Sequence, residues 1–244
     1  NNGGRDMVAE LCAALPEYFF VYGPASSVDM GSAVDNGRAV TRLFDFGNMV
    51  LSKTPILSSR NLLLPRMRTY DRLNLQRGAL EGLIDTPFGP LRFYSVHLDH
   101  TNPTERIAQI RWLVDKVLAY PVEGGAISGI SEFGFPEPPH PDAFLLMGDF
   151  NMQPGSPEYL AMTGLSDVEF GNVPRAAFPI DASKAPEAER ITWIDPKHPN
   201  EAVRQRCLDY CFVHASLAAR VKACTVDTSA VGSDHRPVWL ELEA

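Results

Sequence analysis

The sequence lacks several features that would each indicate a class of protein. It has no apolar run near the ~18–20 residues that a helix needs to cross a bilayer, so we expect no transmembrane segment. No secretory leader is recognisable, although an opening at Asn1 is compatible with a removed one. With no signal for a compartment, we expect a soluble protein, cytoplasmic by default.

Cysteine is also scarce. The chain has 4 cysteines without C-x-x-C spacing, which argues against a structural zinc site and requires no disulfide. Cys207 and Cys211 lie in an apolar run and are interpreted as buried small hydrophobes.

The chain has fewer basic than acidic residues, with 22 Lys and Arg against 30 Asp and Glu. The net charge of −8 argues against simple adhesion to polyanions, and no obligate protein partner is evident. One stretch is nevertheless basic, with a single acidic residue, Asp71, among its cations. This stretch is either a solvated surface loop or a rim that attracts phosphate groups. Its cations are Lys53, Arg60, Arg66, Arg68, Arg72 and Arg77.

The hydrophobic pattern predicts many strands with interspersed helices. Helices are expected at 5–15, from Pro103 behind an Asn102 cap, and near 156–160. Loops are expected at about 24–46, 122–142 and 164–200. This order favours two packed sheets with helices outside over a doubly wound parallel sheet. The expected strands are 18–22, 48–51, 79–84, 91–98, 143–147, 208–213, 221–226 and 238–242.

Four polar clusters follow or interrupt these strands. They are residues 95–100 (Ser-Val-His-Leu-Asp-His), 147–151 (Met-Gly-Asp-Phe-Asn), 208–210 (Leu-Asp-Tyr) and 233–237 (Ser-Asp-His-Arg-Pro). Each alone is weak, because an aspartate at a strand end is more often a turn residue than a catalyst. The first also resembles half of a metallo-β-lactamase zinc motif, but the upstream histidine pair is missing.

Taken together and in this order, the clusters resemble the endonuclease/exonuclease/phosphatase superfamily, which includes deoxyribonuclease I. Residues 47–52 match the family's Gly-Asn-x-x-Leu-Ser strand, and Thr192-Trp193 lies where many members carry Thr-Trp. The resemblance spans almost the whole chain. It implies an α+β fold, namely a deoxyribonuclease I-like four-layer α/β-sandwich of two packed, mainly antiparallel sheets flanked by helices. We expect residues 1–244 to form a single domain of this kind.

The resemblance also implies roles for particular residues. Asp149 would orient and deprotonate the attacking water or help to hold a metal, and Asn151 would position that water or a phosphate oxygen. His235 would contact the phosphoryl oxygen and stabilise the developing charge. Asp209 would hydrogen-bond to His235 and raise its pKa, and His97 would contact phosphate or assist the leaving group.

Two further residues complete the expected site. Asp234 would be a metal ligand together with Asp149, and Arg77 is a weaker candidate for binding phosphate. Oxygen ligands suit Mg²⁺, with Mn²⁺ as a substitute.

The match fails at the start of the chain. Family members begin with an asparagine-bearing strand and a second strand that ends in Gln-Glu, whose glutamate is the principal metal ligand, and neither segment is present. We expect that an N-terminal piece with the first two strands is omitted, the alternative being a degenerate member. Glu10 is interpreted as an exposed helix residue rather than a substitute for that glutamate.

The leading hypothesis is therefore a divalent-metal-dependent phosphoester hydrolase, more a phosphodiesterase than a phosphomonoesterase. Its substrate would be a small diester, a lipid head group or a nucleic acid. The alternative is a non-catalytic binding or scaffold member of the same fold. Retention of all five polar residues at the expected positions argues against that alternative: Asp149, Asn151, Asp209, Asp234 and His235.

Overall fold

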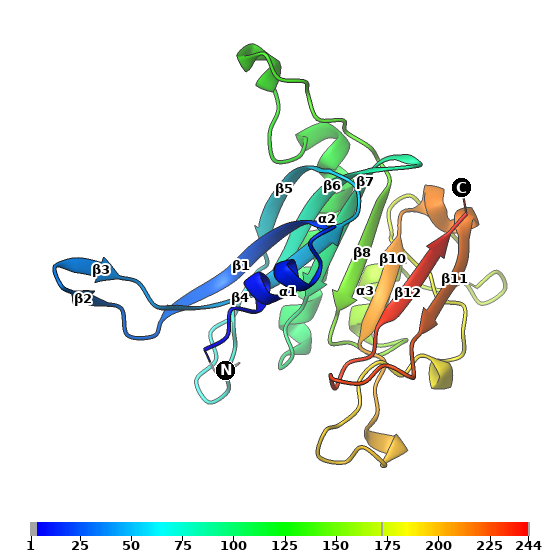
Figure 1. Cartoon of the computed structure of the whole chain (residues 1–244). Helices are drawn as coiled ribbons and strands as arrows, with labels where there is room; N and C mark the ends of the chain where they lie inside the picture. Colours follow the sequence, from blue (N-terminus) through cyan, green and yellow to red (C-terminus); the bar gives the residue numbers. More distant parts are fainter. Residues whose placement is uncertain (1–3, 172, 244) are drawn as a thin grey trace.

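The computed structural model describes residues 4–171 and 173–243 (Figure 1). Strands dominate, as expected, and they separate into one large sheet and three small ones. The elements are α1 (Met7–Ala14), β1 (Phe19–Asp29), β2 (Ala33–Asp35), β3 (Arg38–Val40), β4 (Leu43–Ser52), β5 (Ile56–Leu63), β6 (Gly78–Thr86), β7 (Gly89–His97), α2 (Pro103–Glu123), β8 (Phe144–Asp149), α3 (Pro157–Thr163), β9 (Ile180–Asp181), β10 (Asp209–Val213), β11 (Val221–Val226) and β12 (Val238–Leu242).

A six-stranded sheet in the order β5-β6-β7-β8-β10-β9 forms the centre of the fold. Only the β7–β8 pair in this sheet is parallel, and α2 lies in the crossover between these two strands. The register pairs His97 with Asp149 across β7 and β8, and Asp209 with Asp149 across β10 and β8. Three residues distant in sequence thus meet at one end of the sheet.

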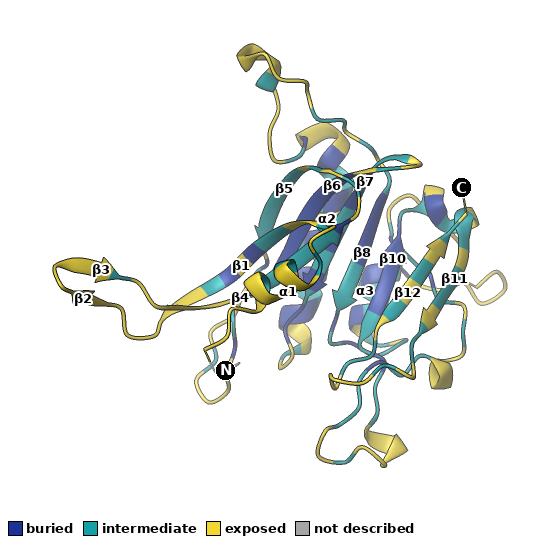
Figure 2. Cartoon of the chain, viewed as in Figure 1, coloured by how far each residue is buried: buried dark blue, intermediate teal, exposed yellow. Residues whose placement is uncertain are grey.

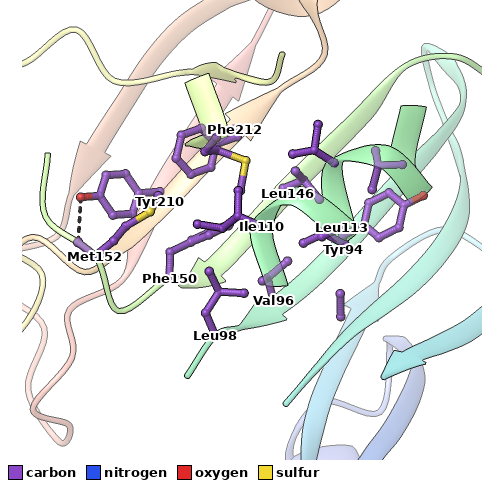
Figure 3. Close-up of a cluster of buried hydrophobic side chains, with 14 of the residues drawn as sticks. Tyr94, Val96, Leu98, Ile110, Leu113, Leu146, Phe150, Met152, Tyr210 and Phe212 are labelled. Atoms are coloured by element: carbon purple, nitrogen blue, oxygen red, sulfur yellow. Dashed lines mark hydrogen bonds between the residues drawn. The ribbon is translucent and has the colours of Figure 1, made fainter. Parts of the chain in front are cut away.

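The main core lies between this sheet and the helices α2 and α3. Ile110 and Leu113 of α2 are fully buried against Tyr94, Leu146 and other side chains of the sheet (Figure 3). One buried polar contact lies at the end of this core, where the Tyr210 hydroxyl donates to the main-chain oxygen of Met152 at 3.0 Å. Burial of large apolar side chains contributes about 1.5–3 kcal/mol each, so this layer fixes the sheet on which the polar strand ends are placed.

The opposite face of the sheet carries two of the small sheets. β1 and β4 form an antiparallel pair that contacts β5, β6 and β7. The amide of Asn48 on β4 donates to the carbonyls of Gly78 and Ser95 at 2.7 and 2.8 Å, which ties the two layers together. The β11–β12 pair packs over β10 around Cys211 and Val213. The result is an α+β sandwich whose buried residues concentrate in the middle strands (Figure 2).

Several boundaries differ from the expectations. β1 continues to Asp29 and β4 begins at Leu43, so most of the expected loop at 24–46 is an extended ribbon whose β2–β3 tip projects away from the sheets (Figure 1). The strand β5 was not expected at all, because its sequence does not alternate between apolar and polar residues. Arg60 lies on this strand, so the basic stretch is not one continuous surface loop.

The helices agree closely with the sequence signals. The Asn102 side chain accepts from the amides of Thr104 and Glu105 at the start of α2, and Ser156 caps α3 in the same manner. Glu10 is exposed on α1 and pairs with Arg5. Within the described ranges, no helix is both long and apolar enough to span a membrane.

Candidate active site

The Gly-Asp-Phe-Asn segment turns sharply at the end of β8. Gly148 has φ of +138°, and a Cβ built there would lie 2.0 Å from the Val96 carbonyl oxygen, so only glycine fits between the strands. Phe150 is fully buried and anchors the turn. Asn151 adopts φ of +49°, which brings its main-chain N–H within 2.8 Å of the Asp149 carboxylate. The turn thereby holds Asp149 and Asn151 in fixed relation.

Asp149 is the centre of a polar cluster. Its Oδ2 lies 3.4 Å from His97 Nε2 and 4.0 Å from His235 Nε2. The Asn151 amide donates to the same oxygen at 3.2 Å and to the Leu98 carbonyl at 3.0 Å. With Asp209, which bonds to His235, five predicted site residues from four separate segments of the chain therefore converge.

Asp209 and His235 form the expected pair. Asp209 Oδ2 lies 2.8 Å from His235 Nδ1, and the histidine side chain is 31% exposed. This hydrogen bond is the main cause that raises the pKa of His235, and the charges of Asp209 and Asp149 act in the same direction. An imidazole held in this way presents its Nε2 toward Asp149 and is more readily cationic.

The pKa of Asp149 is also raised, which for a carboxylate favours the neutral form. Burial, followed by the nearby charge of Asp209, raises the pKa of Asp149 to about 6. Its side chain is 16% exposed, as is that of Asp209. The carboxylate therefore accepts a proton far more readily than an ordinary surface aspartate does.

Arg77 does not lie where a direct phosphate contact would require. It is 4% exposed, with its guanidinium over the Phe46 ring, and it donates to His97 Nε2 at 2.7 Å and to His100 Nδ1 at 2.8 Å. Arginine only donates, so His97 Nε2 accepts and the ring carries its proton on Nδ1. Burial and then the Arg77 charge lower the pKa of His97 to about 3. Arg77 thus acts behind His97, and this arrangement corrects the expectation of direct phosphate binding.

Asp234 is more exposed than the other two aspartates, and its charge also acts to raise the pKa of His235 after the bond to Asp209. It is exposed, and its Oδ2 accepts from the indole N–H of Trp193 at 3.1 Å. Among the residues that the structure describes, no group of three or more His, Cys, Asp or Glu side chains could hold a metal ion. Asp149 and Asp209 are register partners across β8 and β10, and the charge of Asp209 adds to burial, the larger cause, in raising the pKa of Asp149. Mg²⁺ commonly uses only one or two carboxylates and keeps several waters, so this donor pair fits it.

The sequence interpretation missed three contributors to the site. The sequence predicts no role for His100, puts Phe46 in a loop, and offers Thr192 only as part of a Thr-Trp pattern. Thr192 is fully buried beside the start of β10, and its hydroxyl oxygen accepts from the amides of Leu208 and Asp209. The Thr-Trp pattern was the one available signal for it.

The sandwich and the cluster at its strand ends define the class, a deoxyribonuclease I-like fold with paired aspartates and histidines. The chain belongs to the Endonuclease/Exonuclease/phosphatase family, whose model matches residues 9–235. Members of this family are phosphoesterases, including phosphatases and nucleases. No curated protein matches the sequence.

Solved structures of low sequence identity share the fold. One is an endonuclease/exonuclease/phosphatase from Bacteroides vulgatus, with a TM-score of 0.56, 20% identity, and coverage of 97% of this chain and 80% of that one. A mannosyl-6-phosphatase from Bacteroides thetaiotaomicron has a TM-score of 0.54, 19% identity and coverage of 97% and 80%. The 3′ phosphatase NExo from Neisseria, bound to a product DNA hairpin, has a TM-score of 0.57, 16% identity and coverage of 99% and 86%.

Proposed function

We propose that the protein is a divalent-metal-dependent hydrolase of phosphoester bonds, with diesters preferred over monoesters. Asp149 would activate a water for in-line attack on phosphorus. The observation that carries this proposal is the position of the Asp149 carboxylate between two imidazoles, one of which is held by Asp209 at 2.8 Å. A carboxylate with a pKa raised to about 6 is a suitable general base near neutral pH.

The neighbouring residues divide the remaining work. His235, whose pKa is raised by its hydrogen bond to Asp209, would donate to a phosphoryl oxygen where negative charge develops. Asn151 is neutral, so its amide would orient the water or a phosphate oxygen without repelling an anionic substrate. His97, with Arg77 fixing its tautomer, would present an Nδ1–H to phosphate or to the leaving oxygen.

A divalent cation, Mg²⁺ or Mn²⁺, would be held by Asp149, with Asp209 beside it and Asp234 as a further ligand on the rim. When bound, it would neutralise charge on the phosphate and polarise a phosphoryl oxygen. The acidic pair supports this assignment, because burial and then the charge of Asp209 raise the Asp149 pKa, and a cation would offset both.

The substrate class has two sources of support. The fold neighbours named above include a mannosyl-6-phosphatase and a 3′ phosphatase, so a monoester is a candidate substrate. The net charge of −8 makes nonspecific adhesion to nucleic acid unfavourable, which favours small diesters or lipid head groups for this chain. Both ester types therefore belong in the first assay.

The test is hydrolysis of a chromogenic bis-aryl phosphate and of the matching monoester, with Mg²⁺, with Mn²⁺ or with EDTA. We expect metal-dependent turnover, faster on the diester, that falls by at least about 100-fold in Asp149→Asn because the general base is removed. Asp115→Asn, on the exposed side of α2, is the matched control and should keep full activity.

Two results would count against the proposal. Equal turnover in Asp149→Asn and in the wild type would remove Asp149 from the chemistry. No turnover on any ester, together with no measurable Mn²⁺ binding by titration calorimetry, would favour a non-catalytic member of the fold.

A further inference from the structure

A short segment, residues 191–194, lies between the start of β10, which carries Asp209, and the loop before β12, which carries His235. On one side Trp193 exchanges both main-chain hydrogen bonds with Arg206, at 2.9 and 3.0 Å. On the other side the Arg236 amide donates to the Thr192 carbonyl at 2.7 Å, and the Ile194 amide donates to the Asp234 carbonyl at 2.9 Å. The segment therefore fixes the distance between the start of β10 and the loop that precedes β12.

The Thr192 side chain adds a second contact on the β10 side. It is fully buried, and its Oγ1 accepts from the amides of Leu208 and Asp209 at 2.9 and 3.0 Å. One hydroxyl oxygen thus satisfies two consecutive main-chain donors at the residue that holds His235. Loss of this oxygen would leave both donors without their partner, which a buried main chain tolerates poorly.

The Trp193 side chain adds a contact on the other side. Its indole N–H donates to Asp234 Oδ2 at 3.1 Å, although Asp234 is otherwise exposed. Indole nitrogen is a donor only, so the Asp234 carboxylate accepts here and the contact restricts its orientation. A second indole, Trp239 on the last strand, is 63% exposed, and its side chain hydrogen-bonds to Asp227 instead.

We propose that Thr192 and Trp193 are positioning residues that couple the two halves of the site. Thr192 sets the place of Asp209, and hence the Asp209–His235 hydrogen bond, whereas Trp193 orients the Asp234 carboxylate toward a bound cation. Neither residue needs to touch the substrate. The consequence for turnover rests on the proposed function, but the effect on the Asp209–His235 hydrogen bond does not.

The Thr192 half is tested by NMR without any substrate. The imidazole N–H of His235 that is bonded to Asp209 should give a low-field proton resonance, assigned by its loss in His235→Gln. We expect the resonance to persist in Thr192→Ser, which keeps the hydroxyl, and to be lost or moved upfield in Thr192→Val, which keeps only the shape. An unchanged resonance in Thr192→Val, or its equal loss in both variants, would overturn the assignment. Should Thr192→Val fail to fold, Thr192→Ser decides alone, because loss of its resonance refutes the role of the hydroxyl and retention supports it.

The Trp193 half is tested by Mn²⁺ affinity, measured by titration calorimetry rather than by activity. Trp193→Phe keeps an aromatic ring but removes the donor to Asp234. Loss of a residue that hydrogen-bonds to a metal ligand typically lowers metal affinity by about 10–100-fold. We therefore expect Mn²⁺ binding to weaken by about tenfold or more in Trp193→Phe. The His235 resonance should stay in place. Trp239→Phe is the matched control and should bind as the wild type does. Equal affinity in both variants would overturn the role of Trp193.

The outcomes also separate this inference from the proposed function. A wild type that shows the resonance and binds Mn²⁺ but hydrolyses no ester would contradict the proposed function and leave the positioning roles supported. Full turnover in Thr192→Val, with an unchanged KM and kcat, would contradict the positioning role of Thr192 and leave the proposed function standing.

Discussion

Replacement of Asp209 by asparagine is the most informative single change at the site. The side chain keeps its size, and the buried Thr192 hydroxyl still accepts from the residue's main-chain amide, so the backbone should not move. The amide oxygen can still accept from His235 Nδ1 at the present 2.8 Å. Only the negative charge is removed, which isolates its contribution.

The size of the effect follows from the loss of one ionised partner. A hydrogen bond to a charged group contributes about 1.5–3 kcal/mol, against about 0.5–1.5 kcal/mol for a neutral pair. The difference is on the order of 1.4 kcal/mol, so turnover should fall by about tenfold if the cationic form of His235 acts in the transition state. The pKa of His235 should fall, because the bond to Asp209 is the main cause that raises it.

Stability should respond to pH with a defined sign. A histidine whose pKa is raised in the folded state contributes stability that is present below its unfolded pKa and is lost as the pH rises through its folded pKa. Asp209→Asn should therefore destabilise the fold most below about pH 6. At higher pH the loss should shrink further, because burial and then the charge of Asp209 raise the pKa of Asp149 to about 6, and the change removes the second of these causes.

Two measurements check these expectations on the same variant. NMR titration of the His235 ring should show a lower pKa than in the wild type, and urea denaturation should show a smaller stability difference at pH 8.5 than at pH 5.5. An unchanged His235 pKa would show that Asp209 does not hold the imidazole. A stability loss that grows with pH would refute the electrostatic reasoning as a whole.

Three further changes test the scaffold. Gly148→Ala should abolish folding or lower Tm steeply in a thermal melt, because the new Cβ meets the Val96 carbonyl at 2.0 Å and no side chain can move aside. Asn102→Ala removes the cap of α2 and should cost about 1 kcal/mol in urea denaturation; a neutral result would contradict the capping role. Glu158→Ala should cost about 3–5 kcal/mol because it leaves the buried Arg106 guanidinium unpaired, and a loss below 1 kcal/mol would show that water reaches it.

Local sequence signals predicted those parts of the fold that depend on neighbouring residues. The hairpin of β6 and β7 lies where two apolar runs flank a Pro-Phe-Gly-Pro turn in the sequence. The helix α2 begins at Pro103, directly after its Asn102 cap. The strand before Gly148 was equally clear, because a fully apolar run of that length favours a buried strand. In each case the determining residues lie within a few positions of the element.

The features that were missed depend on contacts between distant residues. β5 has no clear alternation of its own, and it is a strand because it pairs with β6. β1 passes through Pro24 only because a register shift between Pro24 and Ser26 accommodates it against β4. Arg77 was expected to face phosphate, but Phe46 and His97 enclose its guanidinium, and nothing near Arg77 in sequence encodes either neighbour.

The same reasoning explains why the candidate site depends on strand register. His97, Asp149 and Asp209 come together because β8 pairs with β7 on one side and with β10 on the other. A slip of one residue would turn the Asp149 side chain to the face that packs against α2, where a carboxylate would be buried among apolar groups. The close approach of Gly148 to Val96 opposes such a slip, because a larger residue placed there would meet a main-chain carbonyl. The glycine that makes the turn possible thus also enforces the pairing that assembles the site.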